Sequence, residues 1–503
     1  MLKLFGGKPD HPLADPREAK RVIEALSTDD PAKSLDELMH WLESVTAAEG
    51  FKPEARVQLL FSLDEAAQPR VRKLAADYFG AVRPSRFQEN RLWTALHGYY
   101  QQAGLSYARA VDLYVQNAKG VEAAKALLPV LLARTLRSLA QQVKWMHLRY
   151  GPVDFRTWAV MNGVYAFSEL RQLAGTAVPL YPGQPGTSSP QEEYLRALVF
   201  GISAPDALLP REAEIAERLI AVYAPKFRLA PAAAPELPFW TDLGQAMAPA
   251  RQTRAAKPGI GLRHFGVDSA LAEIHAHAEA VLTTGAVPPE VNLRGSFESP
   301  AVLEVMRHLH TYWAPQPPER QAPRHPVKSW LSVAYGYEGV MRVLGGSDSL
   351  DFDAQGTEVW VAENVSTGGF GAVVPAVKGD WLRVGTLLAL QPKGGTNWVL
   401  GVVRRMNRVD SQQARVGIET LSRTPAVEHF AVSGVRGMAS PGIVVRGADA
   451  AEAKLVLKPG VFAPAQNLEV ERGGRQHVFI PQAIAEKGED YEIARYRELV
   501  RES

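Results

Sequence analysis

Apolar residues in the first two-thirds of the chain recur every three or four positions, the spacing of one face of an α-helix. The spacing is clear in the run Leu35, Leu38, Leu42 and Val45. Ser34 and Glu37 form a capping-box pattern, which predicts that this helix begins at residue 34. Similar runs continue to residue 228, so we expect a large all-α domain over 1–228. The runs show no fixed repeat period, so the sequence does not support a helical solenoid.

The helical pattern then becomes interrupted. The proline-rich segment 229–258 fits either a linker or short strands that cross to another subdomain, and its sequence does not decide between them. Helical spacing returns in 269–282 and 300–313. We therefore expect a linker or helical subdomain over 229–314 that leads to the next domain.

After residue 314 the pattern changes to short runs rich in β-branched and aromatic residues, separated by Gly, Asp and Asn. Six such runs between residues 327 and 419 predict a small antiparallel β-barrel, to which we assign 315–435. The segment 436–503 has further strand-like runs, two of which flank the hairpin signal Gly473-Gly474. The expected fold class is thus multidomain α+β, with a C-terminal β-rich module.

Composition narrows the functional classes. The chain has 503 residues, 56 Lys and Arg against 54 Asp and Glu, and no Cys. A net charge of +2 argues against a protein that binds a nucleic-acid polymer through a strongly basic surface. The absence of Cys excludes disulfides and thiolate sites and fits a reducing compartment. With no apolar signal segment and no apolar stretch of membrane-spanning length, we expect a cytoplasmic protein without membrane insertion.

Two short motifs near the predicted barrel are suited to binding a small anion that carries flat rings. Arg320 and Arg324 lie four residues apart in a proline-rich arm. Guanidinium groups are planar, permanently charged and able to donate paired hydrogen bonds to phosphate. Asn364, Ser366 and Gly369 follow the second strand-like run; Asn offers donors and an acceptor to a base edge, Ser adds a hydroxyl, and Gly permits close backbone approach.

Together the two motifs resemble the signature of the PilZ family, RxxxR before the first barrel strand and (D/N)xSxxG after the second. The resemblance covers about 315–430. It implies a non-catalytic receptor for cyclic di-GMP, with no other cofactor and no metal. In this family the arginines contact phosphate and guanine, Asn and Ser hold a guanine base, and Gly shapes the turn. The resemblance carries these roles to Arg320, Arg324, Asn364, Ser366 and Gly369.

We expect binding to change the arrangement of the domains, and the helical region to contact a protein partner or a second copy of the chain. The alternative is a ligand-independent structural or adaptor protein with a degenerate PilZ-like barrel. Glu319 favours this alternative, because an anion beside Arg320 would repel the ligand or pair with an arginine. A third possibility is an enzyme in the helical region, but no group of candidate catalytic residues there supports it. The pairs His275/His277 and His308/His310 are two residues apart, so on a helix they cannot share one ligand face.

Overall fold

The computed structural model describes residues 9–27, 29–80, 84–252, 259–316, 319, 322–345, 357–377, 379, 381–410, 412–434, 439–446 and 452–501. The chain folds into two compact units, residues 1–318 and 319–503. Arg320 lies outside the described residues.

The first unit is mainly helical. Its α-helices within the described residues are α1 (Pro16–Ala25), α2 (Pro31–Ala47), α3 (Pro53–Tyr78), α4 (Arg86–Val115), α5 (Leu128–His147), α6 (Phe155–Leu170), α7 (Pro190–Ile202), α8 (Pro210–Tyr223), α9 (Asp268–Thr284) and α10 (Ser299–Trp313). Five of these helices begin with proline, whose fixed φ and missing N–H suit the first helical position.

The start of α2 differs from the predicted start at residue 34. Asp30 is the N-cap, and its carboxylate accepts a hydrogen bond from the backbone N–H of Lys33 at 3.0 Å. Ser34 is buried inside the helix and donates its hydroxyl to the carbonyl of Ser27 at 2.6 Å. The capping-box prediction was therefore wrong by one turn, because an equally good cap preceded it next to a proline.

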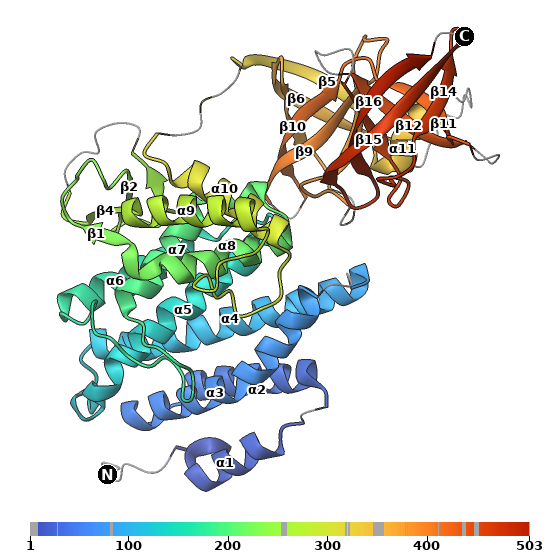
Figure 1. Ribbon diagram of the computed structural model, residues 1–503. Helices are drawn as coiled ribbons and strands as arrows, with labels where there is room; N and C mark the ends of the chain where they lie inside the picture. The colour runs from blue at the N-terminus through green and yellow to red at the C-terminus, as the bar shows by residue number, and fades with distance from the viewer. Residues whose placement is uncertain are drawn as a thin grey trace, which may run out of the picture. The chain divides into compact units, whose positions relative to one another are not determined.

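The helices stack in chain order from α1 to α9 and α10, and each packs on helices one or two places away in sequence (Figure 1). In the described part of the proline-rich segment and just beyond it, the structure has short strands. These are β1 (Arg228–Ala230), β2 (Phe239–Asp242), β3 (Ala250–Arg251) and β4 (Leu262–Gly266), in the order β1-β4-β2-β3. Phe239 and Phe265 join them to the same core as the helices.

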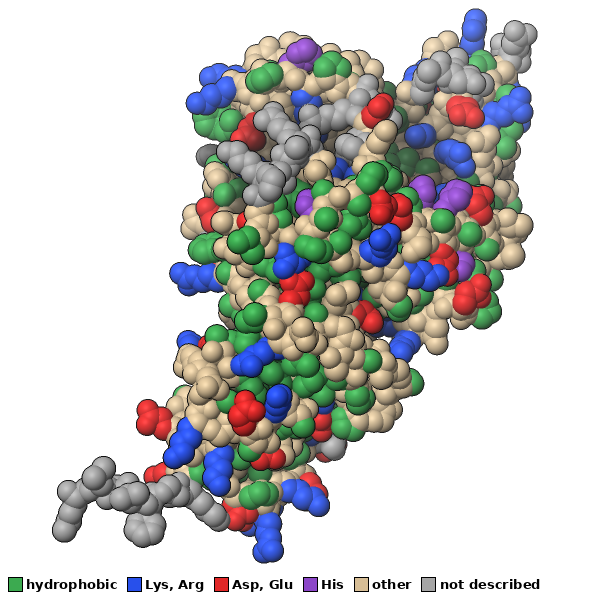
Figure 2. Space-filling view, turned by 90° about the vertical axis from the view of Figure 1, so that its left-hand side faces the viewer, with side chains coloured by type: hydrophobic (Ala, Val, Ile, Leu, Met, Phe, Trp, Pro, Cys, Tyr) green, Lys and Arg blue, Asp and Glu red, His purple; other side chains and the backbone are tan. Residues whose placement is uncertain are grey.

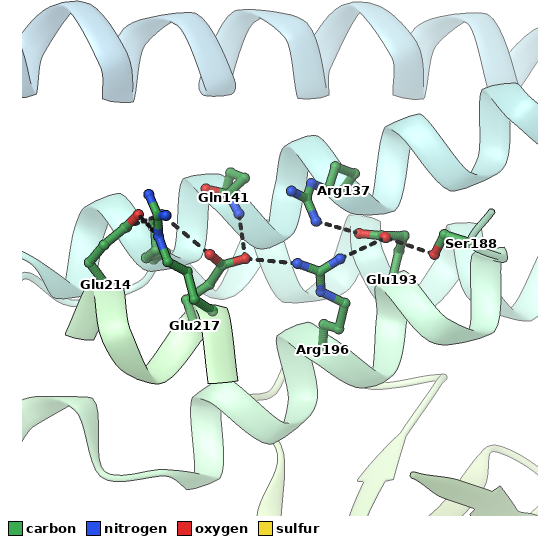
Figure 3. Close-up of polar contacts among 9 residues, drawn as sticks. Arg137, Gln141, Ser188, Glu193, Arg196, Glu214 and Glu217 are labelled. Carbon is green, nitrogen blue, oxygen red and sulfur yellow. Dashed lines mark hydrogen bonds and ion pairs between the residues drawn. The ribbon is translucent and has the colours of Figure 1, made fainter. Parts of the chain in front are cut away.

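A network of charged side chains is buried between α5, α7 and α8 (Figure 3). Glu193 has no exposed surface; it accepts hydrogen bonds from Ser188 at 2.8 Å, Arg196 at 3.1 Å and Arg137 at 3.4 Å. Arg196 also donates to Glu217 at 3.0 Å, which links α7 to α8. The buried charges are therefore compensated by partners from neighbouring helices.

The pKa values of two carboxylates of this network, Glu193 and Glu217, are lowered. Burial by itself would raise the pKa of Glu193, but Arg196 and Arg137 outweigh it and hold that pKa below its ordinary value. The pKa of Glu217 is lowered in the same way, with Lys144 and Arg196 overcoming the effect of burial. Lys144 of α5 also belongs to this network: its ammonium donates a hydrogen bond to the carboxylate of Glu214 in α8 at 2.8 Å.

The second unit contains two closed six-stranded antiparallel barrels. The first has the order β10-β7-β6-β5-β8-β9 and consists of β5 (His325–Tyr335), β6 (Thr357–Ser366), β7 (Gly369–Val374), β8 (Leu387–Pro392), β9 (Val399–Arg408) and β10 (Ala414–Ser422). The second has the order β11-β12-β13-β16-β15-β14 and consists of β11 (Ala426–Val432), β12 (Ser440–Arg446), β13 (Glu452–Leu457), β14 (Leu468–Arg472), β15 (Arg475–Lys487) and β16 (Glu492–Arg501).

The fold class predicted from sequence is confirmed: a large helical region precedes a small antiparallel barrel and a C-terminal β-rich module. The Gly473-Gly474 hairpin joins β14 to β15, and both glycines have the positive φ that a tight primed turn requires. Residues 426–432, which the sequence had grouped with the first barrel, form a strand of the second.

A short helix, α11 (Gly336–Leu344), lies between the two barrels and packs against β5, β8 and β11. The hydroxyl of Tyr337 donates to the carbonyl of Pro441 in β12 at 2.7 Å. Its backbone N–H donates to the carboxylate of Asp490 at 2.7 Å. Apolar residues of both barrels, such as Leu387 and Ile443, belong to one buried cluster. The barrels therefore share a core.

On the face shown in Figure 2, basic and acidic side chains are interspersed, with hydrophobic side chains between them. This agrees with the small net charge of +2. Within the described part of the chain, no helix has the length and apolar character needed to cross a membrane.

Candidate ligand-binding site

The residues Asn364, Ser366 and Gly369 lie on the hairpin between β6 and β7. Ser366 and Gly369 are paired across the two strands, so Thr367 and Gly368 form the loop. The backbone N–H of Thr420, in β10, donates to the carbonyl of Gly368 at 2.9 Å and holds the loop against the next strand. The motif is thus a tight hairpin fixed by β10.

Position 369 has no room for a side chain. A Cβ added there would lie 1.9 Å from the carbonyl oxygen of Ile418 in β10. Because this obstacle is backbone within a strand pair, it cannot move without breaking the barrel. Glycine is required here by the close approach of two strands.

Asn364 lies on β6 opposite Gly371 of β7. A Cβ at position 371 would lie 2.6 Å from Nδ2 and 2.7 Å from Oδ1 of the Asn364 carboxamide. The carboxamide therefore occupies space that exists because residue 371 is glycine. Asn364 is half-buried, so its polar end is placed by the strand pair while still reaching solvent.

Ser366 is half-buried at the end of β6, and its hydroxyl has a long contact of 3.4 Å to the carbonyl of Gly369. A hydrogen bond of that length is weak, so the hydroxyl is available for a better partner. Together, the Ser366 hydroxyl and the Asn364 carboxamide offer hydrogen-bond donors and acceptors to a ligand at the end of β6.

The structure brings Arg324 to this hairpin. Its neighbour His325 begins β5 and pairs with Val365 of β6. Continuing this antiparallel register by one residue places Arg324 beside Ser366. Arg324 is exposed, and no acidic partner for it is found among the described residues.

Acidic side chains near the hairpin are already compensated. Glu363 lies 3.7 Å from Arg415. Glu419, which pairs with Gly369 across the β7–β10 ladder, accepts a hydrogen bond from Arg404 at 2.6 Å. These pairs reduce the repulsion that an anionic ligand would meet at this end of the barrel.

Two residues at the site were not predicted from sequence. Gly371 was not among the predicted site residues, although the run Gly368, Gly369 and Gly371 is typical of close backbone packing. Arg423 follows β10, and its guanidinium donates to the carbonyl oxygens of Ser366 and Thr367, both at 3.2 Å. No local pattern marks Arg423, because β10 reaches the hairpin only when the barrel closes.

A closed barrel with an Asn-x-Ser-x-x-Gly hairpin beside an arginine that precedes the first strand agrees with the PilZ signature found in the sequence. Comparison with family models confirms a PilZ domain within this barrel. Residues 353–426 match the middle PilZ domain of the cyclic-di-GMP receptor FimW, and residues 17–236 match the N-terminal domain of the same receptor. No curated protein matches the chain.

The first of these matches begins at residue 353, so it includes the Asn364–Gly369 hairpin but not Arg320 or Arg324. The second barrel lies almost entirely beyond both matches. Among the described residues, no group of three or more His, Asp and Glu side chains is arranged to hold a metal ion.

Proposed function

We propose that this protein is a cyclic di-GMP effector that binds the nucleotide at the β6–β7 hairpin of the first barrel. The observation that carries the proposal is the β5–β6 register, which brings the end of the arginine motif next to the Asn-x-Ser-x-x-Gly hairpin. The receptor family to which both matched models belong supports the same ligand.

The proposed roles follow from the chemistry of each side chain. Arg324 and Arg320 bind phosphate and stack on guanine, since a guanidinium is both a charged fork and a flat surface. Asn364 and Ser366 hydrogen-bond a guanine edge. Gly369 allows β10 to hold the hairpin closely. The ligand carries two phosphates, so arginines at one site can balance its charge although the whole protein has a net charge of only +2.

Isothermal titration of the full chain with cyclic di-GMP tests this proposal. We expect binding by the wild type and at least about tenfold weaker binding by Arg324→Ala, since a charged hydrogen bond contributes about 1.5–3 kcal/mol. The matched control is Lys328→Ala, which removes an exposed positive charge from the same strand, β5. Its affinity should equal that of the wild type.

The result would be decisive in either direction. A wild type that does not bind at about 50 μM ligand contradicts the proposal and supports the ligand-independent adaptor that Glu319 favours. Equal losses in Arg324→Ala and Lys328→Ala would contradict the assigned role of Arg324. Melting temperatures without ligand should be unchanged in both variants, because both side chains are exposed.

The second part of the proposal is that binding changes the arrangement of the two units and so controls a partner. The arginine motif stands directly after residue 318, where the first compact unit ends. A ligand bound by both this segment and the hairpin would restrict the connection between the units. Small-angle scattering with and without cyclic di-GMP should show a change in the radius of gyration that Arg324→Ala abolishes.

A further inference from the structure

The connector between the two barrels, residues 423–425, lies against the ligand-binding hairpin through Arg423. The Nη2 group of Arg423 donates to the carbonyl oxygens of Ser366 and Thr367, at 3.2 Å each. The same two residues belong to the hairpin that carries the Asn-x-Ser-x-x-Gly motif. The contact is therefore with the proposed site itself.

Strand order puts Arg324 and Arg423 on opposite sides of this hairpin. β6 lies between β5 and β7, and β7 lies between β6 and β10. Arg324 comes from the β5 side, one residue before His325, which pairs with Val365. Arg423 comes from the β10 side, beyond Glu419, which pairs with Gly369. Guanidinium-bearing residues thus flank the hairpin on both edges.

Arg423 keeps donors for a ligand. Its side chain is exposed, and among the described residues its only hydrogen bonds are those made by Nη2. Nε and Nη1 therefore have no protein acceptor in that part of the chain. A guanidinium fixed by one nitrogen and open at the other two is oriented to bind a phosphate or the O6/N7 edge of guanine.

We propose that Arg423 is a further ligand-contacting residue, which binds a phosphate or guanine of cyclic di-GMP from the side opposite Arg324. The inference rests on the proposed function of the hairpin and adds the inter-barrel connector to the site. Binding then involves the segment that leads directly into β11 of the second barrel.

Titration of full-length variants with cyclic di-GMP tests this inference. Arg423→Ala should bind at least about tenfold more weakly than the wild type, and Arg423→Lys, which keeps the charge but not the fork, should fall between the two. The matched control is Arg475→Ala, an exposed arginine at the β14–β15 hairpin of the second barrel. It should bind as the wild type does.

Salt dependence separates a direct contact from a merely structural role. An interaction between Arg423 and the ligand's charge weakens as salt screens it, so the wild type should lose more affinity between about 50 mM and about 300 mM salt than Arg423→Ala does. If Arg423→Ala binds weakly but keeps the wild-type salt dependence, Arg423 only holds the hairpin and the direct contact is refuted.

The other outcomes are equally informative. If the wild type binds and Arg423→Ala binds as tightly, the inference about Arg423 fails while the proposed function stands. If the wild type itself does not bind, the proposed function fails. Because Arg423 is exposed, its variants should melt at the wild-type temperature without ligand. If Arg423→Ala melts at a lower temperature, the affinity of Arg423→Lys is compared with that of the wild type instead.

Discussion

At the scale of single residues, the site depends on glycines that make room for other groups. Gly369 lets the backbone of β10 approach, and Gly371 leaves space for the carboxamide of Asn364. The first glycine is needed for the barrel, whereas the second is needed for the position of a side chain. Substitution should therefore have different effects at the two positions.

Gly371→Ala should lower cyclic di-GMP affinity by about tenfold with a small loss of stability. Its Cβ would meet the Asn364 carboxamide at 2.6 Å, and the half-buried carboxamide can turn away toward solvent. The control is Gly417→Ala, which faces Gly371 across the β7–β10 ladder and whose Cβ would make an ordinary 3.5 Å contact with Arg405. Titration and thermal melting measure both effects; equal affinity in the two variants would contradict the role of Gly371.

The sequence could predict Asn364, Ser366 and Gly369 as a group because their spacing is local. It also predicted Arg324, whose position next to Ser366 depends on a single strand pair. The contact between Gly371 and Asn364 lies within the β6–β7 hairpin and depends on the register of the two strands. The contact of Arg423 forms only when the barrel closes, so no spacing along the chain predicts it.

At the scale of elements, ion pairs with forked geometry connect strands that are distant in sequence. Arg404 of β9 donates from Nη1 and Nη2 to the two carboxylate oxygens of Glu486 in β15, at 2.7 and 2.6 Å. It also donates from Nε to Glu419 of β10 at 2.6 Å. One side chain thus joins both barrels and the strand that supports the proposed ligand-binding hairpin.

Arg404→Lys should destabilise the second unit by about 1–2 kcal/mol, because a lysine ammonium cannot form the paired hydrogen bonds. The comparison is Arg415→Lys, since Arg415 is an exposed neighbour on β10 with a single 3.7 Å contact to Glu363. That change should stay within about 0.5 kcal/mol. Urea denaturation followed by tryptophan fluorescence compares them, and similar losses would show that the fork is unimportant.

In the helical unit, the carboxylate of Glu193 is fully buried between Arg137 and Arg196, so its loss should lower stability. Glu193→Gln leaves Arg137 and Arg196 without their shared counterion and should cost about 3 kcal/mol at pH 7. Glu24→Gln, an exposed change in α1, should cost less than about 0.5 kcal/mol. Urea denaturation followed by helical circular dichroism gives both values.

The same variant tests the pH dependence. The pKa of Glu193 in the folded chain is below its ordinary value, so this carboxylate stabilises the fold above the unfolded pKa. As the pH falls below about 4.5, the unfolded chain takes up a proton before the folded chain does, and this stabilisation is lost. Glu193→Gln should therefore lose less stability than the wild type between pH 7 and about 4. An identical loss would contradict the assignment.

The elements that the sequence predicted are those with a strong local period. Strands of the first barrel were visible as apolar runs, and the Gly473-Gly474 turn was visible as a dipeptide. Helix α11 was missed because its nine residues include Gly336 and Gly339 and are too few to show a helical period. Networks such as that of Glu193 join distant helices and leave no local pattern.

At the scale of the whole molecule, the two barrels form one folding unit. Leu387 and Val402 of the first barrel share a buried cluster with Ile443 and Val456 of the second. Separating the barrels would expose this apolar surface to water. The second barrel therefore helps to keep the first barrel folded.

A fragment of residues 319–425 should therefore melt at a lower temperature than a fragment of residues 319–503, or aggregate. The difference should be at least about 10 °C, since several buried apolar side chains lose their partners and each contributes about 1.5–3 kcal/mol. Circular dichroism melting and size-exclusion chromatography compare the two fragments. Equal melting temperatures would contradict a shared core.

Barrel closure has a consequence for how any partner recognises this protein. Both barrels of the second unit are closed, so the described strands there offer no free edge to an incoming chain. In the first unit the edge strands β1 and β3 have three and two residues, too few to seat an extended peptide. A partner therefore cannot bind these sheets by adding a β-strand to them. A partner of these sheets therefore has to contact side chains and loops. Substitution of surface residues, not competition with extended peptides, should identify the residues that determine its specificity.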